Sequence, residues 1–552
     1  MLGMLRSEMI RARQFHTFRP LLGLRSSKLR QVQATKAPEA VETQSIHPTA
    51  PARTRFAPSP TGFLHLGSLR TALYNYLLAK NTGGQFILRL EDTDQERLVP
   101  EAEQNIYEYL TWAGIHWDEG PDKDGPYGPY KQSERTEIYN QHIGKLLDSG
   151  HAYRCFCSKS RLDSLRDSAR KLYPPSLASY DRKCTNLSRQ QSDDMAAQGQ
   201  EYTIRFKSPT QYPEFEDLLH GKLNLQTQVN YQDLRYEDPV LIKSDGLPTY
   251  HFANVVDDHL MKITHVIRGE EWLLSGPKHV ALYDALGWTA PKFVHIPLLT
   301  SASDKKLSKR SGDSGVSSLR DRGILPEALV NFVALFGWSP TKSSNAASAV
   351  VDGQPAEAYT IDQLVSIFDL NGLTKGNAKV DDRKLLYFNK YFFQKRLQDD
   401  SLRPGILDQC KELIKPYVDS SDSDIADSIR KSDEYLDHVL SLVGLYIQSP
   451  QDFQNRTEFF FKRPNWDAVT IAEKDRNPTR AILVAARDLF KHNPDLDTLI
   501  KSGNFDKKQV FTALRYALAG GIPGLRIPQI MKELGTDICL RRIENCIQRL
   551  SL

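Results

Sequence analysis

The stretch RFAPSPTGFLHLGSLRTAL, residues 55–73, decides the fold, because it leads from a short strand through a glycine turn into a helix. The strand at its start is expected to stop at Pro58, since proline cannot continue a central ladder. Apolar residues then recur at helical spacing as far as Lys80, so the helix is expected to begin at Gly67 or Ser68.

A second strand is expected over residues 85–90, where the sequence QFILRL is mostly apolar. Strand, helix and strand make a βαβ unit, for which a parallel pair with its ligand at the carboxyl ends is expected. Free N–H groups at the helix start favour an anion, and Gly67 lets a flat base or a phosphate approach the backbone. Glu91, Asp92 and Asp94 follow the second strand, where they could hold an ammonium group or a magnesium ion, or cap a turn.

Two blocks of this region are similar to those of a known enzyme family. Residues 55–73 resemble the HIGH signature region of class I glutamyl-tRNA synthetases, and LRLEDTDQER, residues 88–97, resembles the next block of that family. The four-letter signature here is HLGS, residues 65–68, with Ser68 in place of the last His of the general pattern. The glutamyl branch often has a small or neutral residue there, so this departure is compatible with the family.

Two further blocks resemble the substrate-binding part of the same family. GLPTYHFANVVDDH, residues 246–259, resembles its substrate helix, on which Tyr250 and Asn254 lie one turn apart and share a face. Without the resemblance, this pair would be interpreted as half-buried packing. HVIRGEEW, residues 265–272, places a short apolar strand before Arg268, and a planar guanidinium can meet a side-chain carboxylate with two hydrogen bonds.

A basic segment, DKKLSKR at residues 304–310, contains ammonium groups, a hydroxyl and a guanidinium, which all bind phosphate. Short Lys/Arg clusters are commonly no more than solvated surface. Here KLSKR, residues 306–310, matches the KMSKS loop of class I synthetases in its glutamyl form, and it follows HIPLL, residues 295–299, as in that family. The resemblance implies that the HLGS turn and the lysines of this loop enclose the triphosphate of ATP.

The resemblance assigns two sets of site residues. Those expected to bind glutamate are Arg55, Phe56, Ala57, Ser59, Glu91, Tyr250, Asn254 and Arg268. Those expected to bind ATP or to act in catalysis are His65, Gly67, Ser68, Glu271, Lys306, Leu307, Ser308, Lys309 and Arg310. In this interpretation Glu91 meets the ammonium group of glutamate, Arg268 its side-chain carboxylate, and ATP acts as its Mg²⁺ complex.

The segment between the two halves, residues 131–245, corresponds to an inserted α/β domain with which the family holds the acceptor end of tRNA. It contains Cys155, Cys157 and Cys184, and some bacterial members bind zinc with such a Cys-x-Cys pair, a later Cys and a fourth ligand. No fourth ligand is evident after Cys184, although Tyr180 and Asp181 are near. Three thiols make an incomplete tetrahedral site, so ordinary buried thiols are preferred to a structural zinc.

After residue 320 helical periodicity dominates, and no succession of alternating strands predicts a β-barrel. A helical anticodon-binding region, as in bacterial-type members, is therefore expected. The whole chain is predicted to contain a transit peptide with linker (1–50), the first half of a Rossmann-like α/β catalytic domain (51–130), the inserted α/β domain (131–245), the second catalytic half (246–325), a stem-contact region (326–375) and an all-helical anticodon-binding region (376–552).

The composition of the first residues indicates a targeting segment. Residues 1–36 hold eight Lys and Arg against the single acid Glu8, mixed with apolar residues and serines, which is typical of a mitochondrial transit peptide. The alternative is a disordered basic tail that binds RNA. Without this segment the net charge of +4 falls to about −3, so tRNA has to meet local basic patches. The six Cys indicate no disulfide framework, and no apolar run approaches the length of a membrane span. A monomer in the mitochondrial matrix, acting on glutamate, ATP and tRNA, is expected.

Three rival functions are disfavoured by particular residues. Glutaminyl-tRNA synthetases have Pro-Glu-Pro-Asn where this chain has PSPT, and Ser59 and Arg268 argue against them. The truncated glutamyl-queuosine enzyme has no anticodon domain, whereas this chain continues to Leu552. An RNA-binding relic without catalysis would not need His65 and the two lysines of the basic segment. The sequence leaves open whether the mitochondrial glutamine tRNA is charged in addition to the glutamate tRNA.

Overall fold

The structure is a computed structural model that describes residues 45–552 except 124, 174, 177, 226–233, 301–314, 341–357, 377, 380, 493–494 and 552. The chain forms one compact unit over Ile46–Leu552. The expected transit peptide therefore lies largely outside the described residues, and the basic segment 304–310 lies wholly outside them. None of the helices that the structure describes is long and apolar enough to cross a membrane.

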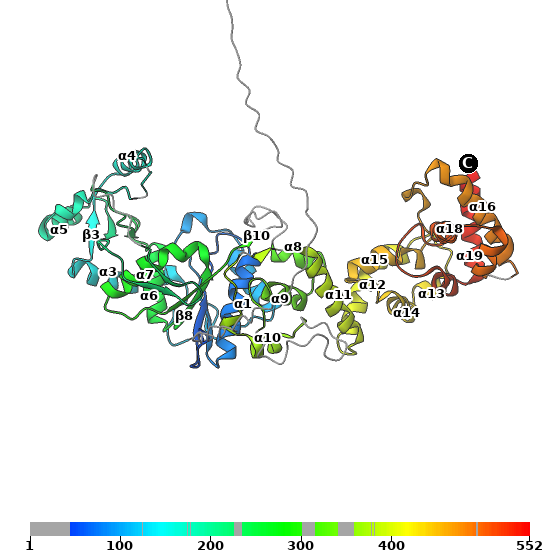
Figure 1. Cartoon of the computed structure of the whole chain (residues 1–552), viewed down its shortest axis with the longest axis horizontal. Coiled ribbons are helices and arrows are strands. Elements are labelled where there is room, and N and C mark those ends of the chain that lie inside the picture. The colour runs from blue at the N-terminus through cyan, green and yellow to red at the C-terminus, as the bar shows by residue number, and fades with distance from the viewer. Residues whose placement is uncertain are drawn as a thin grey trace, which may run out of the picture. The chain divides into compact units, whose positions relative to one another are not determined.

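The predicted βαβ unit is present. Strands β1 (Arg53–Phe56) and β2 (Gln85–Leu88) pair in parallel, and helix α1 (Leu66–Asn81) joins them (Figure 1). Both strands are shorter than expected. The helix begins before Gly67 because the imidazole of His65 acts as the N-cap and accepts a hydrogen bond from the backbone N–H of Ser68.

The second half of the sheet lies beside the first. Strands β8 (His265–Gly269) and β9 (Lys292–Ile296) pair in parallel and are joined by the 3-10 turn η4 (Glu270–Ser275) and helix α7 (Gly276–Ala285). The backbone N–H of Thr264, just before β8, donates to the carbonyl of Arg53 at 2.9 Å, which places β8 next to β1.

A hairpin extends this sheet beyond β9. Strand β5 (Phe215–Asp217) runs parallel to β9 and pairs antiparallel with β6 (Gly221–Leu223), so the hydrogen-bonded order is β6-β5-β9-β8. Both strands of the hairpin fall within the range predicted for the insert, 131–245, and yet they pair with the catalytic half. The hairpin therefore brings residues of that range to the edge of the main sheet.

The two faces of the sheet belong to different cores, as alternation along the strands requires. In β8, Val266 packs with helices α6 (Tyr250–Leu260) and α7, whereas Ile267 packs with α1 and α9 (Pro326–Ala334). In β9, Phe293 lies in the same core as Val266, and Val294 lies in the same core as Ile267. Because side chains two apart share a face, Arg268 of β8 and His295 of β9 lie on the α6 and α7 face.

The segment between the halves contains short elements around a second sheet. Strands β3 (Ala152–Cys155), β4 (Thr203–Phe206) and β7 (Val240–Ile242) form it, in the order β3-β4-β7 and with antiparallel pairing. Its helices and turns are η2 (Gln132–Arg135), α3 (Thr136–Asp148), α4 (Lys159–Arg170), η3 (Lys183–Asn186) and α5 (Arg189–Ala197). The turn η1 (Gln95–Arg97) and helix α2 (Ala102–Trp112) come before it, in the first catalytic half, and α2 packs in the same core as α1.

The rest of the chain is helical apart from two short strands, β10 (Leu299–Thr300) and β11 (Ala378–Lys379), which pair in parallel. Its first elements are α8 (Val316–Asp321), α9 (Pro326–Ala334), α10 (Ile361–Ile367) and η7 (Leu370–Gly372). Then come α11 (Asp382–Gln398), α12 (Arg403–Val418), α13 (Asp427–Arg430), α14 (Asp433–Val443), α15 (Pro450–Thr457), η8 (Glu458–Phe460), η9 (Trp466–Ala468), α16 (Glu473–Phe490), α17 (Leu496–Gly503), α18 (Lys507–Ala519) and α19 (Ile527–Ser551). No strand follows β11 among the residues described, as the sequence predicts, and one apolar core joins α11 to α19.

Candidate functional site

A cavity of about 1580 Å³ opens at the carboxyl ends of the parallel strands, where this fold class places its ligands. All the expected site residues that the structure describes line it: Arg55, Phe56, Ala57, Ser59, His65, Gly67, Ser68, Glu91, Tyr250, Asn254, Arg268 and Glu271. Their side chains come from segments that are far apart in the sequence. The remaining expected residues, Lys306, Leu307, Ser308, Lys309 and Arg310, lie outside the described part of the chain.

The HLGS turn forms the start of α1 at one wall of the cavity. The Nδ1 atom of His65 lies 3.3 Å from the backbone N of Ser68, and its Nε2 atom lies 3.0 Å from the Ser68 hydroxyl. A Cβ added at Gly67 would lie 3.2 Å from the His65 ring, which is closer than side chains normally approach. Ser68 and Gly67 therefore both determine where the imidazole of His65 lies.

Gly315, the first described residue after 301–314, contacts this turn. It forms an antiparallel bridge with His65. The backbone N–H of Val316 donates to the carbonyl of Leu64 at 3.1 Å. The carboxyl-terminal flank of residues 301–314 thus pairs directly with the HLGS turn, while the places of the lysines themselves stay a prediction.

Glu91 lies at the end of β2 between a cation and an amide. Its Oε1 accepts from Arg89 at 3.0 Å and from the side-chain amide of Asn254 at 3.2 Å. Burial raises the pKa of the Glu91 carboxyl above its ordinary value, although the charges of Arg89 and Arg55 oppose this rise. A ligand with an ammonium group would stabilise the ionised carboxylate in this place.

The other two acids after β2 each contact another residue of the described chain. Asp92 accepts from the backbone N–H of Ser133 at 2.8 Å and from its hydroxyl at 2.6 Å, which joins the end of β2 to a residue 41 positions later. Asp94 is ion-paired with Arg97. Glu91 is the acid of this group that contacts Asn254.

Arg55 and Arg89 share a buried carboxylate beneath the cavity. The Nε of Arg55 lies 3.1 Å from Oδ1 of Asp258, and Nη1 of Arg89 lies 2.7 Å from the same oxygen. Burial raises the pKa of Asp258, but the two guanidinium charges outweigh burial and hold this pKa below its ordinary value. Arg55 thus lines the cavity as a cation that is already ion-paired.

Arg268 differs from Arg55 because its described partners are neutral. Its Nε donates to Nε2 of His295 at 2.9 Å, and its Nη1 donates to the Tyr250 hydroxyl at 3.0 Å and lies 3.3 Å from Nδ1 of His279. Burial lowers the pKa of His295 to about 4, and burial followed by the charge of Arg268 holds the pKa of His279 well below its ordinary value. Arg268 is 4% exposed and forms no ion pair with a carboxylate of the described chain, so an anionic ligand would supply the missing charge.

Aromatic side chains complete this end of the cavity. The ring of Tyr250 lies 4.1 Å from that of Trp272, and Trp272 is 37% exposed. Glu271 lies against the backbone of Gly269, where a Cβ would lie 2.1 Å from the Glu271 carboxylate. A side chain at position 269 would therefore displace this carboxylate from its present place.

Sequence reasoning missed the buried groups that hold these side chains. His295 was quoted only as part of HIPLL, and Asp217, His279, Arg89 and Asp258 were not singled out. Buried polar residues of this kind have no spacing of their own, since their partners lie on other strands and helices. The pairing of β5 with β9 was the missing information for Asp217 and His295.

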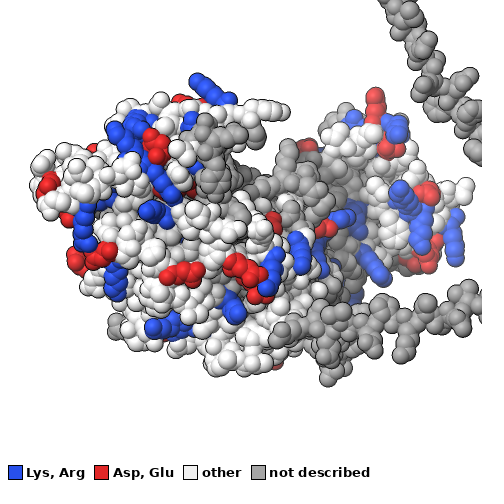
Figure 2. All heavy atoms as spheres, turned by 60° about the vertical axis from the view of Figure 1, so that its left-hand side comes forward, with Lys and Arg blue, Asp and Glu red and all other residues white. Residues whose placement is uncertain are grey.

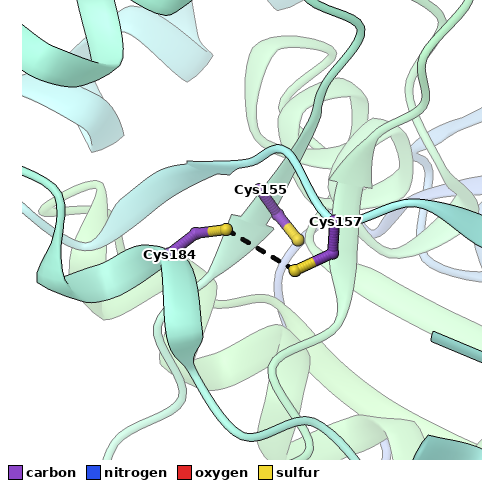
Figure 3. Close-up of side chains that lie close together, drawn as sticks. All are labelled: Cys155, Cys157 and Cys184. Carbon is purple, nitrogen blue, oxygen red and sulfur yellow. Dashed lines mark hydrogen bonds between the residues drawn. The ribbon is translucent and has the colours of Figure 1, made fainter. Parts of the chain in front are cut away.

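The three cysteines of the insert come together (Figure 3). Their sulfur atoms all lie within 4.8 Å of one another, with Sγ of Cys157 and Cys184 3.6 Å apart. Around a tetrahedral zinc with Zn–S bonds of about 2.3 Å, sulfur atoms are about 3.8 Å apart. The hydroxyl of Tyr180 lies 3.2 Å from Sγ of Cys155 and 3.6 Å from that of Cys157, so it is placed as a fourth donor. The structure therefore brings three thiols and a hydroxyl together, and whether they hold a zinc ion stays a prediction.

Charge on the surface is dispersed. On the face in Figure 2, Lys and Arg lie in several small groups with Asp and Glu between them. Surface pairs such as Arg154 with Asp193 and Arg189 with Asp148 are part of this pattern. A polyanion would therefore meet local basic groups on this face, as the near-neutral charge of the chain after residue 36 predicts.

Comparison with known proteins gives consistent matches over nearly the whole described chain. Residues 51–386 match the family described as tRNA synthetases class I (E and Q), catalytic domain, and residues 409–547 match an anticodon binding domain. The mitochondrial glutamate–tRNA ligase of Saccharomyces cerevisiae is 51% identical over 516 residues, which cover 92% of each chain. The glutamate–tRNA ligase of Clostridioides difficile is 39% identical, over 89% of this chain and 98% of its own.

Solved structures agree in fold. The crystal structure of a glutamate tRNA ligase from Elizabethkingia meningosepticum CCUG26117 in complex with its amino acid is 34% identical, with a TM-score of 0.73. The match covers 91% of this chain and 100% of that chain. The glutamate–tRNA synthetase of Elizabethkingia anophelis matches with a TM-score of 0.70 and 35% identity, over 90% of this chain and 99% of its own.

Proposed function

Because the chain belongs to the class I tRNA synthetases of the glutamate and glutamine type, we propose that it joins L-glutamate to tRNA through a glutamyl-adenylate made from ATP. The ligase activity agrees with the names of its relatives, which are glutamate–tRNA ligases.

The observation that carries the choice of glutamate is the environment of Arg268. Its guanidinium is buried, borders the cavity and donates to neutral partners on the described chain. A side-chain carboxylate can accept two of its hydrogen bonds and neutralise its charge, whereas the neutral amide of glutamine leaves the charge uncompensated. Glutamate is therefore the amino acid that fits this end of the cavity.

Glu91 supports binding of the other end of glutamate. An ammonium group that approaches Glu91 would form a charge-assisted hydrogen bond with a carboxylate already held by Asn254 and Arg89. With the side-chain carboxylate at Arg268 and the ammonium group at Glu91, the α-carboxylate of glutamate remains unoccupied. That carboxylate is the nucleophile of the proposed reaction.

In the first step an oxygen of the α-carboxylate attacks the α-phosphorus of ATP, and pyrophosphate leaves in line as the glutamyl-adenylate forms. No covalent enzyme intermediate and no general base are required, so catalysis consists of positioning and charge stabilisation. His65 and Gly67 at the start of α1 would bind the nucleotide, and Lys306 and Lys309 would offset the charge that grows on the departing phosphates. Magnesium accompanies ATP as part of the substrate.

In the second step a hydroxyl of the terminal ribose of tRNA attacks the acyl carbon, and AMP leaves. The class I family implies the 2′-hydroxyl as the nucleophile. The helical region that matches an anticodon binding domain would bind the distal part of the tRNA. We propose that the protein acts as a monomer in the mitochondrial matrix, which agrees with the mitochondrial relative and with the composition of residues 1–36.

Pyrophosphate exchange tests the proposed reaction. Purified protein with ATP and tRNA is expected to exchange label between pyrophosphate and ATP when glutamate is present, but not with glutamine. An Arg268→Gln variant is expected to lose glutamate-dependent exchange by about a hundredfold, since a buried charged contact is worth several kcal/mol. Exchange that depends on glutamine, or none with either amino acid, would contradict the proposal.

Two further assays address the tRNA and the compartment. Charging of purified mitochondrial glutamate tRNA is expected, and charging of the glutamine tRNA in a parallel reaction would add a second substrate. A fusion of residues 1–50 to a fluorescent protein is expected to enter mitochondria, and a cytosolic fusion would remove the transit-peptide assignment.

A further inference from the structure

Three buried polar side chains form a row across adjacent strands behind the cavity. Asp217 is on β5, His295 is on β9 and Arg268 is on β8, and the pairing of β8 with β9 places Arg268 directly opposite His295. Asp217 and His295 are fully buried, and Arg268 is nearly so. Because the strands belong to one sheet, the spacing of the three groups is determined by backbone hydrogen bonds.

The carboxylate of Asp217 accepts four hydrogen bonds. Its Oδ1 accepts from the backbone N–H groups of Leu219 at 2.9 Å and His220 at 2.8 Å. Its Oδ2 accepts from the backbone N–H of His295 at 2.9 Å and lies 2.7 Å from Nδ1 of the same residue. An ionised carboxylate has about four acceptor positions and donates nothing, so the Nδ1 atom of His295 must carry the proton.

This arrangement selects one tautomer of His295. With its proton on Nδ1, a neutral imidazole presents a lone pair at Nε2, and that atom lies 2.9 Å from Nε of Arg268. The other tautomer would turn an N–H group toward the N–H of the guanidinium. Asp217 therefore makes His295 an acceptor for Arg268, although it does not touch Arg268 itself.

The guanidinium is held along one edge as a result. The Nε and Nη1 atoms contact His295, Tyr250 and His279, whereas Nη2 donates to the carbonyl of Trp272 at 3.5 Å, at the limit of a hydrogen bond. Arg268 lines the cavity, and Nη2 is the nitrogen of its guanidinium with the weakest contact to the rest of the chain. Rotation of the planar group would break the contact with His295, so this contact fixes which N–H groups meet a ligand.

We propose that Asp217 and His295 are positioning residues that orient the guanidinium of Arg268 toward the side-chain carboxylate of glutamate. This inference rests on the proposed function. It assigns to the two residues a share of the affinity for glutamate, and of its discrimination from glutamine, without contact with the substrate.

Two substitutions at position 295 separate positioning from structure. In His295→Gln the amide oxygen reaches about as far as Nε2 and can accept from Arg268. In His295→Asn the shorter amide reaches about as far as Nδ1, so it can contact Asp217 but not Arg268. Asp217→Asn gives a third test, because its NH₂ group would face donors and favour the wrong tautomer of His295.

The measurements are the KM for glutamate and for ATP, kcat, the ratio of kcat/KM for glutamate to that for glutamine, and the melting temperature. His295→Asn and Asp217→Asn are expected to raise the KM for glutamate by about tenfold or more, with the KM for ATP unchanged. His295→Gln is expected to stay within about threefold of the wild type. His142→Asn, in a buried histidine on α3 away from the cavity, is the matched control and is expected to leave both KM values unchanged.

Equal KM values for glutamate in the Asn and Gln variants, whether both are raised or both are normal, would overturn the positioning role. A loss of melting temperature without a change in KM or in the glutamate-to-glutamine ratio would also overturn it, because a structural role alone has that effect. If the wild type fails to charge tRNA with glutamate, the proposed function itself fails, and this result is distinct from a normal wild type with unaffected variants.

Discussion

The side-chain amide of Asn254 donates to the carboxylate of Glu91 at 3.2 Å, which joins helix α6 to the end of strand β2. The contact is made at the carboxylate expected to receive the ammonium group of glutamate. Burial raises the pKa of Glu91, so the carboxylate depends on cations and amide donors around it to remain ionised.

Replacement of Glu91 by Gln is expected to raise the KM for glutamate by about thirtyfold or more, because a buried ammonium group would lose its charged partner. Steady-state charging at varied glutamate concentration measures this effect. Asp148→Asn removes an exposed carboxylate of α3 that pairs with Arg189, and it is the control expected to behave as the wild type. A Glu91→Gln variant with normal KM would show that the ammonium group binds elsewhere.

Replacement of Lys309 by Ala is expected to slow formation of the adenylate by about a hundredfold, or about 2.7 kcal/mol of barrier, while the fold survives. The reason is that its ammonium group would offset charge on the departing pyrophosphate. Single-turnover activation with saturating ATP and glutamate measures the rate. Lys222→Ala, at an exposed lysine of β6 paired with Glu214, serves as the control. An unchanged rate would remove the basic segment from the mechanism.

The thiols of Cys155, Cys157 and Cys184, with the hydroxyl of Tyr180, are expected to hold about one zinc ion per chain. Metal analysis of protein purified without chelator checks this expectation. Cys184→Ser is expected to lose the metal, and Tyr180→Phe to release it faster to a chelator.

Cys546→Ala is the matched control for the metal analysis, because this buried thiol of α19 lies outside the cluster. It is expected to retain the full metal content. If the wild-type protein contains no metal and a chelator leaves its melting temperature unchanged, the three cysteines are ordinary buried thiols.

Stability is expected to fall as the pH is lowered from about 6.5 toward 4 because His295 is buried as a neutral group. Burial lowers its pKa to about 4, with contributions in the same direction from Arg268 and His220, while Asp217 opposes the shift. In that interval the unfolded chain binds a proton that the folded chain excludes, so the free energy of unfolding decreases with decreasing pH.

Urea unfolding of the wild type and of His295→Gln at pH 7.5 and pH 5 tests this linkage. The difference in the free energy of unfolding between the two proteins is expected to be smaller at pH 5, by up to about 2 kcal/mol, since Gln does not titrate. His116→Gln, at an exposed position, is expected to show the same difference from the wild type at both pH values. A difference that is constant with pH for His295→Gln would contradict the neutral state of His295.

Much of the fold followed from local patterns. The βαβ unit, helix α6 and the helical carboxyl-terminal region are present as expected, and the fold class is confirmed by the solved relatives. The boundaries were less accurate. The helix was expected to begin at Gly67 or Ser68, whereas it begins at Leu66 because the imidazole of His65 acts as its N-cap.

The site residues that lie in sequence blocks resembling the family were predicted. The buried residues whose contacts depend on the pairing of distant strands were missed. The twelve described site residues line one cavity, although their individual roles stay predictions. Asp217 and His295 are 78 positions apart, and a lone buried Asp or His in a strand has many explanations. Their contact depends on the parallel pairing of β5 with β9, which no local sequence pattern predicts. The sequence shows that Tyr180 is near Cys184. Whether its hydroxyl reaches the thiols depends on the path of the chain between them.

The bridge between His65 and Gly315 limits how far Lys306 and Lys309, the lysines proposed to offset charge on the phosphates, can lie from the HLGS turn. Lys309 precedes Gly315 by six residues and Lys306 by nine, so contour length alone confines them to within about 22 Å and 32 Å of that anchor. An insertion between Arg310 and Gly315 would lengthen this tether. It would lower the effective concentration of the two ammonium groups at the nucleotide, although every side chain would be retained.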